Sequence, residues 1–463
     1  MADNFARRLE ATARRIPDTP ALVWGGGGLT FGELDRRAGA FAGTLAARGV
    51  KPGDRIALTI GNHWAFAVAL LAGWKLGATV APLDALLKDD ERSGILADLA
   101  PAAVVGEADV AIKGPPAAPS ARSSELLGGA SSAALILYTS GSTGRPKGAL
   151  LSHAALELAI ESWAGPVMAL TRDDVVLATL PLAHSFGLNG ALLAPLLVGA
   201  TVAVVERFAP DRAVDAIRRH RVTVFPGVAT MFRRLLDAPE LAAADFGSVR
   251  IAVSGAAPCP WELADRWRGR TGVRIVRGYG MTELFRPISY QAANPTESPD
   301  SIGWPVPGVE IRIVDDELWI RSPSAMDAYL NAPEETREVL IDGWFRTGDL
   351  ATVSADGLVT IVGRKRERIL RGGYSVFPPE VEAVLLAHPA VVEAAVLGVP
   401  HPELGEDVAA FVALRPDSAA TPDDLIAHCR ERLAAFKYPR RLIVVDALPK
   451  STTGKVMKSK LTL

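Results

Sequence analysis

Short runs of β-forming residues alternate with helical patterns over the first half of the chain, from about Leu29 to Val253. Residues 54–60 are typical of a strand and precede an apolar helical pattern at 63–77, and residues 222–227 precede another at 228–238. A chain that alternates in this way folds into parallel sheets with helices on both faces. We therefore predict an α/β protein whose large N-terminal domain contains doubly wound sheets.

The pattern changes after Gly280. Residues 308–322 and 350–364 each contain two alternating strands around an Asp-containing turn, which predicts a small antiparallel β-barrel or sheet. A charged cluster follows at 364–371, and then helix, strand and helix patterns of an α+β unit. We place a domain boundary in the charged cluster, so that residues 1–365 form the N-terminal domain and residues 366–463 a smaller C-terminal domain.

Composition excludes several classes of protein. The 463 residues contain 50 Lys plus Arg against 52 Asp plus Glu, which offers no electrostatic footprint for nucleic acid. Two cysteines, Cys259 and Cys429, provide no disulfide framework and fit the cytoplasm. The apolar run at 188–205 is interrupted by Asn189, Pro195 and glycines, so we expect a buried helix followed by a strand and no membrane span.

The stretch "YTSGSTGRPKG" lies between two apolar runs. Small residues, hydroxyls and backbone N–H groups, together with Lys147, are the groups that bind phosphate oxygens. The expected local structure is an apolar strand, the loop and then a helical pattern. Lys147 precedes Gly148 instead of Ser or Thr, so the stretch is not a Walker A loop. By composition alone, a phosphate-binding loop and a flexible linker fit equally well.

The order of five motifs decides between these alternatives. "YTSGSTGRPKG", "GYGMTE", "WFRTGDLA", "GRKRERILRGGYSVFPPEVE" and "PKSTTGKVMK" resemble the core motifs of the adenylate-forming superfamily, which includes acyl-CoA synthetases, peptide adenylation domains and firefly luciferase. The resemblance extends from roughly residue 20 to residue 458. It implies attack of a carboxylate on the α-phosphorus of ATP, then transfer of the acyl group from acyl-AMP to the thiol of coenzyme A.

The resemblance also assigns roles. It implies that Tyr279 stacks on adenine, Thr282 bonds the α-phosphate and Glu283 holds Mg²⁺, while Asp349 binds the ribose with Arg364 nearby. The implied ATP-binding residues are Thr139, Ser140, Gly141, Ser142, Thr143, Gly144, Lys147, Gly255, Ala256, Ala257, Tyr279, Gly280, Met281, Thr282, Asp349, Arg364 and Lys455. The implied catalytic residues are Lys455, Thr282, Glu283 and Lys147.

In the family, the small C-terminal domain is mobile and carries the equivalent of Lys455 into the site. Arg366 matches the hinge, where relatives commonly have Asp or Lys, and Gly372 and Gly373 match a strand that lines the coenzyme A tunnel. We interpret Lys365, Glu367 and Arg368 as a solvated linker.

The acid pocket is expected from three segments around Phe186, Val228 and Met281. The complete predicted lining is His184, Phe186, Leu188, Val228, Gly278, Gly280, Met281 and Leu284. His184 is either a gate or a packed histidine. Amino-acid-activating relatives hold the α-amine with an Asp near this segment, but no acidic residue occurs here from 181 to 205, which disfavours an amino acid substrate. Gly278 stands where malonate-activating relatives have Arg. Arg286 is a minor candidate for binding a second carboxylate. The apolar remainder favours an aromatic or a short to medium aliphatic acid.

Two alternatives remain open at this stage. The acceptor can be the phosphopantetheine arm of a carrier protein instead of coenzyme A, or the chain can be a non-catalytic nucleotide-binding relative. Intact Lys147, Glu283 and Lys455 disfavour the second. A homodimer is the expected assembly if the chain is not a monomer.

Overall fold

The computed structural model describes residues 4–110, 133–139, 146–238, 242–294, 298–416, 418–450 and 456–462. The chain divides into two compact units, one made of Met1–Glu310 and Arg321–Phe345, the other of Ile311–Ile320 and Arg346–Leu463. The domain boundary predicted between residues 365 and 366 lies inside the second unit. As a functional boundary it stays a prediction.

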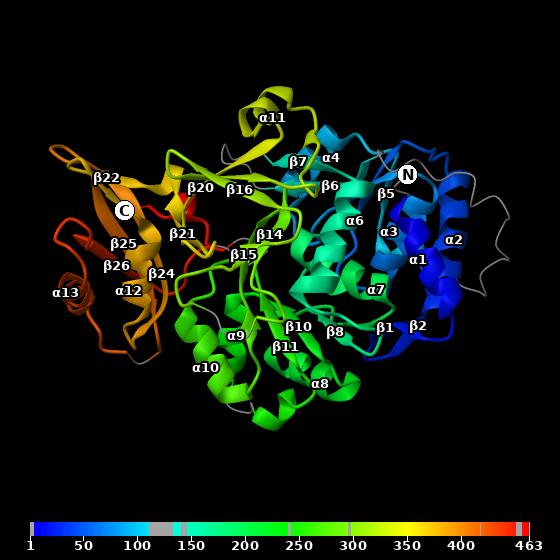
Figure 1. Ribbon diagram of the computed structural model, residues 1–463, viewed down its shortest axis with the longest axis horizontal. Helices are drawn as coiled ribbons and strands as arrows, with labels where there is room; N and C mark the ends of the chain where they lie inside the picture. The colour runs from blue at the N-terminus through cyan, green and yellow to red at the C-terminus, as the bar shows by residue number, and fades with distance from the viewer. Residues whose placement is uncertain are drawn as a thin grey trace. The chain divides into compact units, whose positions relative to one another are not determined.

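A seven-stranded sheet forms the lower part of the first unit in Figure 1, in the order β12-β11-β10-β8-β9-β1-β2. Its pairs are parallel except for β1 with β2. The strands are β1 Pro20–Trp24, β2 Gly27–Thr30, β8 Val175–Ala178, β9 Thr201–Val204, β10 Val224–Gly227, β11 Ile251–Ser254 and β12 Ile275–Val276. Helices α8 Pro210–His220, α9 Ala229–Leu236 and α10 Trp261–Thr271 pack against them around the buried rings of Phe225, Phe232 and Trp267.

A second sheet has six strands in the order β18-β7-β6-β4-β3-β5. They are β3 Arg55–Leu58, β4 Thr79–Pro82, β5 Ala103–Val105, β6 Ala133–Thr139, β7 Lys147–Ser152 and β18 Ala328–Tyr329. Strands β3 to β6 are parallel, and helix α3 Trp64–Lys75 between β3 and β4 is buried at every residue after Trp64. A helix that is apolar all round is a core helix. These two sheets confirm the predicted α/β fold class.

The helix predicted directly after the Gly/Ser/Thr loop is wrong. Lys147 begins strand β7, which pairs antiparallel with β6 so that Thr139 lies opposite Lys147. Gly148 has no room for a β-carbon, which would lie 2.8 Å from the Ile136 side chain. Helix α6 begins only at His153, after its N-cap Ser152. The loop therefore joins two paired strands, and in the described part of the chain the next helix begins at His153.

The antiparallel region predicted after Gly280 consists of two sheets. Strands β13 Gly278–Met281, β14 Phe285–Ser289 and β15 Trp304–Pro305 form a three-stranded sheet. Strands β16 Glu310–Val314, β17 Glu317–Arg321, β19 Leu340–Ile341, β20 Trp344–Val353 and β21 Val359–Arg364 form the other. The turn between β16 and β17 has Asp315 and Asp316 at φ +51° and +64°, the conformation of a tight hairpin turn.

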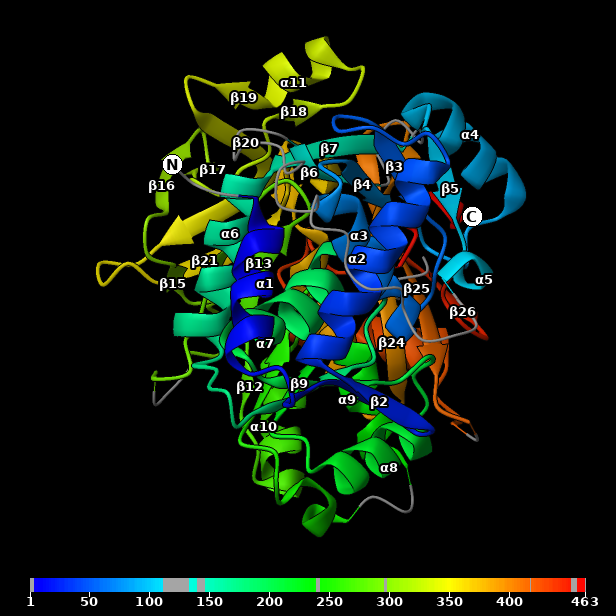
Figure 2. The same ribbon diagram turned by 90° about the vertical axis from the view of Figure 1, so that its right-hand side faces the viewer.

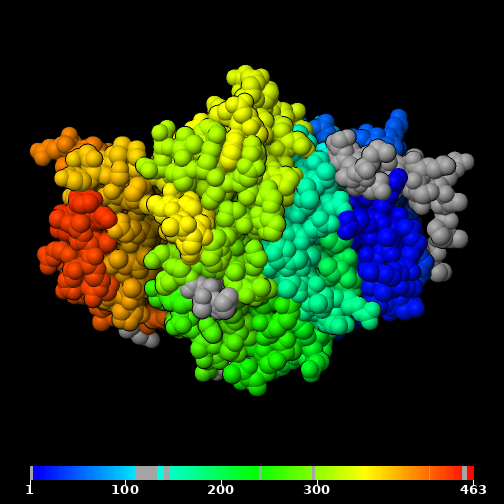
Figure 3. Space-filling view, viewed as in Figure 1, coloured from blue at the N-terminus to red at the C-terminus, as the bar shows by residue number. Residues whose placement is uncertain are grey.

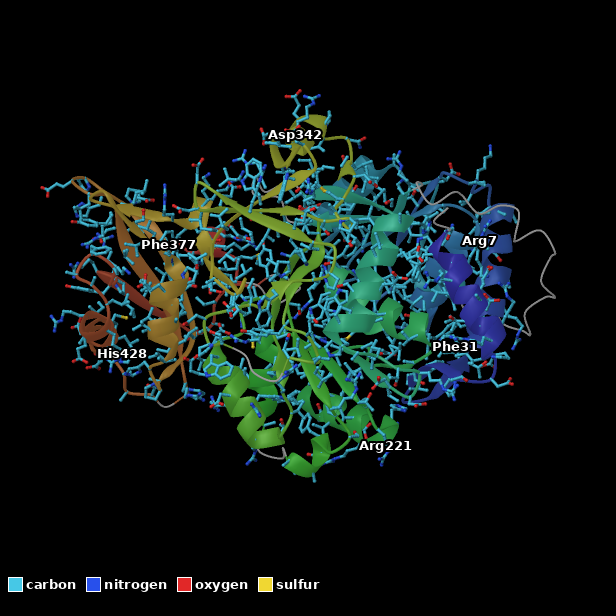
Figure 4. All side chains as sticks on the ribbon, in the orientation of Figure 1. Arg7, Phe31, Arg221, Asp342, Phe377 and His428 are labelled. Carbon is cyan, nitrogen blue, oxygen red and sulfur yellow. The ribbon has the colours of Figure 1, made fainter. Side chains whose placement is uncertain are left out.

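The C-terminal part of the second unit is the predicted α+β fold. Its sheet contains β22 Ile369–Arg371, β23 Tyr374–Val376, β24 Val391–His401, β25 Gly405–Leu414 and β26 Arg441–Val445. Helices α12 Pro378–Leu386 and α13 Pro422–Arg432 share one apolar core with it. Phe377, labelled in Figure 4, precedes α12, and His428 of α13 bonds the Val384 carbonyl of α12 at 3.1 Å.

The remaining helices cover the first unit. They are α1 Phe5–Arg15, α2 Phe31–Ala47, α4 Asp89–Leu99, α5 Glu107–Val110, α6 His153–Ser162, α7 Ala194–Val198 and α11 Pro333–Val339, with π-helical segments η1 Trp163–Val167 and η2 Gly187–Leu193. Helices α1, α2 and α3 lie side by side in Figure 2. Within the described ranges, no helix has the length and apolar character that a membrane crossing requires.

Helix α1 is anchored on α6 and α3. Arg8 bonds Glu161 of α6 at 3.2 Å, and the surfaces of α1 and α6 adjoin in Figure 3. The Phe5 backbone N–H donates to Nδ1 of buried His153 at 3.2 Å. The His153 ring also lies edge-on to Trp74. Burial lowers the pKa of His153 from 6.5 to about 4, which keeps Nδ1 available as an acceptor at neutral pH.

This pKa predicts a loss of stability in acid. Because the folded pKa of His153 is lowered, the unfolded chain binds a proton that the folded chain excludes between about pH 6.5 and 4. The free energy of unfolding is therefore highest above about pH 6.5 and decreases by about 3 kcal/mol as the pH is lowered toward 4. We expect His153→Gln to reduce the acid-induced fall in the unfolding midpoint of the first unit, measured by denaturation at pH 7 and 4.5. An equal fall in both proteins would contradict the assignment.

Candidate active site

The tight hairpin of β13 and β14 positions the predicted Thr282 and Glu283 in its turn. Met281 pairs with Phe285, and a β-carbon on Gly280 would lie 2.0 Å from the Phe285 carbonyl oxygen. Phe285 itself has φ +57°, a left-handed conformation that is strained for an aromatic residue. Only glycine at 280 permits this approach of the two strands. The hairpin thus fixes where Glu283 lies.

Glu283 is buried, and its Oε1 accepts a hydrogen bond of 2.8 Å from the Tyr329 hydroxyl. Burial, and then the charge of Glu283, raise the pKa of Tyr329, so its hydroxyl stays protonated and donates. Nζ of Lys147 lies 5.4 Å from the centroid of the Tyr329 ring, within the range of a cation–π contact. The structure therefore brings Lys147 and Glu283 together through Tyr329.

Sequence reasoning missed Tyr329. The residue belongs to β18, a two-residue strand whose Tyr329 pairs with Ala149 of β7. Such a short strand gives no periodic signal in the sequence, and its partner lies 180 positions away. No pattern in the sequence could have placed Tyr329 beside Glu283.

The Glu283 carboxylate fits a magnesium ion that is shared with nucleotide phosphates. Mg²⁺ is commonly bound by one or two carboxylates together with substrate phosphates, without a dedicated protein cage. In the described part of the chain, no group of three or more His, Cys, Asp or Glu side chains could hold a metal. A single buried carboxylate is compatible with binding of Mg²⁺ together with a nucleotide.

The predicted adenine loop follows β11. Gly255 is buried, and a β-carbon on it would lie 3.0 Å from Nη1 of Arg286 and 3.1 Å from the Phe186 ring. Ala256 is exposed and has φ +63°, and Ala257 follows it half-buried. A non-glycine residue in this conformation often marks a ligand-binding loop. On β13, Tyr279 and Met281 are half-buried, with the Tyr279 hydroxyl 3.9 Å from the Met281 sulfur.

Arg286 lies where the acid pocket is predicted. A β-carbon on Gly278 would lie 2.5 Å from Nη2 of Arg286, so the guanidinium fills the space next to this glycine. Its Cζ lies 4.9 Å from the centroid of the Trp163 ring, which stacks on Phe186 at 5.3 Å. The predicted residues Phe186 and Gly278 therefore do meet around one group. That group is a buried cation, whereas the sequence predicted an apolar lining.

Hydrogen bonds hold the Arg286 guanidinium in place. Nη1 donates to the Ser254 carbonyl at 2.9 Å and Nη2 to the Val276 carbonyl at 3.3 Å, while Nε donates to Oγ of Ser289 at 2.9 Å. The side chain thereby ties the carboxyl ends of β11 and β12 to β14. These contacts explain why Arg286 is buried.

Three other predicted pocket residues are buried. Leu188 is buried in η2, Val228 is buried directly before α9, and Leu284 is buried after Glu283. Leu284 and Arg286 also line a cavity of about 130 Å³ together with Ser162. His184 is held by a contact of 2.9 Å between its Nε2 and Oδ2 of the buried Asp84. His184 is thus anchored by a carboxylate.

In the second unit, the predicted ribose pair is formed. Asp349 lies opposite Arg364 in the β20–β21 register, and Nε of Arg364 donates to Oδ1 of Asp349 at 3.0 Å. The Asp349 side chain is buried, whereas that of Arg364 is half exposed. The second unit therefore presents a carboxylate and a guanidinium side by side, and their role in ribose binding stays a prediction.

Two residues of the predicted solvated linker form ion pairs, although Lys365 is exposed and Glu367 half-buried. Lys365 forms an ion pair of 3.1 Å with buried Glu317, and Glu367 pairs with Lys458 at 2.9 Å. Burial alone would raise the pKa of Glu317, but the bonds from Lys365 and Arg346 outweigh it and lower the pKa. These ion pairs fix residues around the predicted hinge.

The residue predicted as the hinge and the two predicted to line the tunnel lie in different local structures. Arg366 is exposed in a short 3₁₀ turn. Gly372 and Gly373 form the two-residue turn between β22 and β23 at φ +55° and +85°, instead of lying within a strand as expected. Ser140, Gly141, Ser142, Thr143, Gly144 and Lys455 lie outside the described residues.

Comparisons with known proteins identify the family of the chain. The family model described as AMP-binding enzyme matches residues 9–330, and the model of its C-terminal domain matches residues 380–455. A feruloyl-CoA synthase of an Amycolatopsis species is 35% identical and aligns over 97% of this chain and 96% of its own length.

Two solved structures are also similar. ATP-bound MatB from Rhodopseudomonas palustris has a TM-score of 0.92 and 31% identity, covering 99% of this chain and 98% of its own. A benzoate CoA ligase from Burkholderia xenovorans LB400 has a TM-score of 0.88, 31% identity and the same coverage of this chain, with 99% of its own chain covered. The chain belongs to the AMP-binding enzyme family. Its class is that of the AMP-forming acyl-CoA ligases.

The β13–β14 hairpin yields a direct test. Gly280→Ala places a β-carbon against the Phe285 carbonyl, so the turn that carries Glu283 must shift. We expect acid-dependent pyrophosphate release to fall about 100-fold, because displacement of a catalytic group by about 1 Å has this effect. Gly43→Ala in α2 is the control, since nothing lies within 4 Å of its added β-carbon. Equal activity of both variants would show that the close approach is not needed.

Proposed function

We propose that this ligase activates an aromatic or a short to medium aliphatic carboxylic acid, with ATP, Mg²⁺ and coenzyme A as the other reactants. The observation that supports the site is the buried Glu283 carboxylate, which Tyr329 links to Lys147. An anion-binding cation and a metal-binding carboxylate at one place suit a reaction between two anions, the acid and ATP.

The residues of the first unit would act by positioning. Lys147 offsets phosphate charge at the end of the glycine-rich loop, and Thr282 donates its hydroxyl to the α-phosphate. Glu283 would hold Mg²⁺, which neutralises charge on the phosphates when it is bound. Tyr279 and the loop of Gly255 to Ala257 would bind adenine. Alignment of the carboxylate with the α-phosphorus then accounts for much of the rate.

The second unit would supply the remaining groups. Asp349 accepts hydrogen bonds from the ribose hydroxyls, and Arg364, which is already bonded to Asp349, keeps that carboxylate oriented. Lys455 would stabilise the negative charge that develops between the acid and the α-phosphate. Arg366 remains the proposed hinge, and Gly372 with Gly373 the proposed contact for pantetheine. A cytoplasmic location and a homodimer remain predictions from the sequence.

The Arg286 guanidinium supports a compact acid. It fills the space beside Gly278 and is covered on one face by Trp163, which limits the room for a long chain beside this glycine. Its three described hydrogen bonds go to two carbonyls and a hydroxyl of the protein itself. Binding of a second carboxylate would compete with these bonds, which disfavours a dicarboxylic acid. A benzoate or a small aliphatic acid fits best.

The first experiment identifies the acid and the acceptor. Pyrophosphate release is measured with benzoates, fatty acids of increasing length and dicarboxylates, each with and without coenzyme A, on wild type and Lys455→Ala. We expect one compact acid to give an acyl-CoA by mass spectrometry and the variant to lose most of the acyl-AMP formation. Acyl-AMP without thioester would favour a carrier protein as acceptor. No release with any acid would contradict the ligase reading.

A second prediction tests the size limit. Arg286→Ala removes the guanidinium and should raise the kcat/KM of a longer acid relative to benzoate about 10-fold or more, the effect of one or a few methylenes in an apolar pocket. Arg286→Met keeps most of the volume and should preserve the wild-type preference. Circular dichroism and the KM for ATP control for folding. An unchanged acid preference in a folded Arg286→Ala protein would show that Arg286 does not limit the length of the acid.

A further inference from the structure

We propose that Tyr329 is a positioning residue for the adenylation step, which holds the Glu283 carboxylate in the orientation that binds Mg²⁺ with ATP. This inference rests on the proposed function, since Glu283 and Lys147 have their roles only in that reaction. The carrying observation is the hydrogen bond of 2.8 Å from the Tyr329 hydroxyl to Oε1 of Glu283, with both side chains buried.

The segment 326–330 connects the hairpin turn to the strand that carries Lys147. At one end, the Met326 N–H donates to the Glu283 carbonyl at 2.8 Å. Along β7, the Asp327 N–H donates to the Leu150 carbonyl at 2.9 Å and the Leu330 N–H to the Gly148 carbonyl at 2.7 Å. Tyr329 therefore lies in a segment that is bonded to both predicted phosphate-binding elements. Its backbone has little freedom to move away from Glu283.

The Tyr329 backbone has a further anchor. Its N–H donates to Oγ1 of Thr336 in α11 at 2.9 Å. Because the backbone is fixed on both sides, the phenol ring has a defined direction, and Lys147 lies over this ring. One side chain thus contacts the proposed metal-binding carboxylate and the proposed phosphate-binding ammonium.

A neutral donor suits this position. A lysine or arginine in place of Tyr329 would neutralise Glu283 and weaken its attraction for a cation, whereas a phenol restrains one oxygen and leaves the negative charge in place. Partners of metal-binding carboxylates that act in this way typically change metal affinity or activity 10- to 100-fold when they are removed. A hydrogen bond that served stability alone would have no such effect on the metal.

The test removes the hydroxyl and leaves the ring. For Tyr329→Phe, we expect the Mg²⁺ concentration that half-saturates ATP binding, measured by calorimetry without any acid, to rise about 10-fold. In single-turnover experiments, acyl-AMP formation should slow by a similar factor, while thioester formation from supplied acyl-AMP should not change. The first readout does not depend on turnover.

The chain offers a matched control in Thr223→Val. The Thr223 hydroxyl donates to Oδ1 of the buried Asp174 at 2.6 Å, so this variant also loses a bond between a hydroxyl and a carboxylate, but at residues with no predicted role in the site. We expect a similar change in thermal midpoint for the two variants and a wild-type Mg²⁺ dependence for Thr223→Val. A wild-type Mg²⁺ dependence of Tyr329→Phe would overturn the inference, as would an equal shift in both variants.

Glu283→Gln separates this inference from the proposed function. If Glu283→Gln raises the Mg²⁺ requirement and Tyr329→Phe does not, the proposed function stands and the positioning role fails. If Glu283→Gln binds ATP and Mg²⁺ like wild type, the metal-binding role of Glu283 fails, and the role of Tyr329 fails with it.

Discussion

The burial of the Glu283 carboxylate is the constraint on which the arrangement of the first unit depends. A charged group that leaves water must be bonded by the protein or by a ligand, because an isolated buried charge is costly. The structure meets this requirement with the Tyr329 hydroxyl, and the bond in turn requires that β18 lie on β7. The short strand, the strained hairpin and the pairing of β6 with β7 therefore support one another.

Much of the fold could be predicted from the sequence, because its signals are local. The alternation of strands and helices up to Val253 and the Asp-rich turn at Asp315 and Asp316 depend on residues close together in the chain. The strand that begins at Lys147 could not be predicted from the sequence, because it depends on contacts with residues that are not its neighbours in the chain. Its residues are apolar enough for a helix, and only pairing with β6 and the small size of Gly148 select the extended form.

The candidate site could be predicted where the resemblance supplies motif residues, and not where a contact involves a residue outside the motifs. The resemblance supplies Asp349 and Arg364 from two separate motifs, and the structure pairs them. Two other contacts could not be predicted, because they depend on how the strands pack and not on the spacing of residues in the sequence. They are the ion pair of Glu317 with Lys365 and the contact of Arg286 with Gly278. For Arg286, this changes the interpretation of the pocket, because a residue beyond the motif fills space next to a motif glycine.

The pairing of Thr139 with Lys147 has a consequence for how nucleotide is received. Both ends of the phosphate loop belong to one strand pair, so they cannot move apart without breaking the sheet. The backbone of Lys147 is therefore held in place by strand pairing. In the proposed reaction, binding of ATP and release of AMP would then require no rearrangement of the strand that carries Lys147.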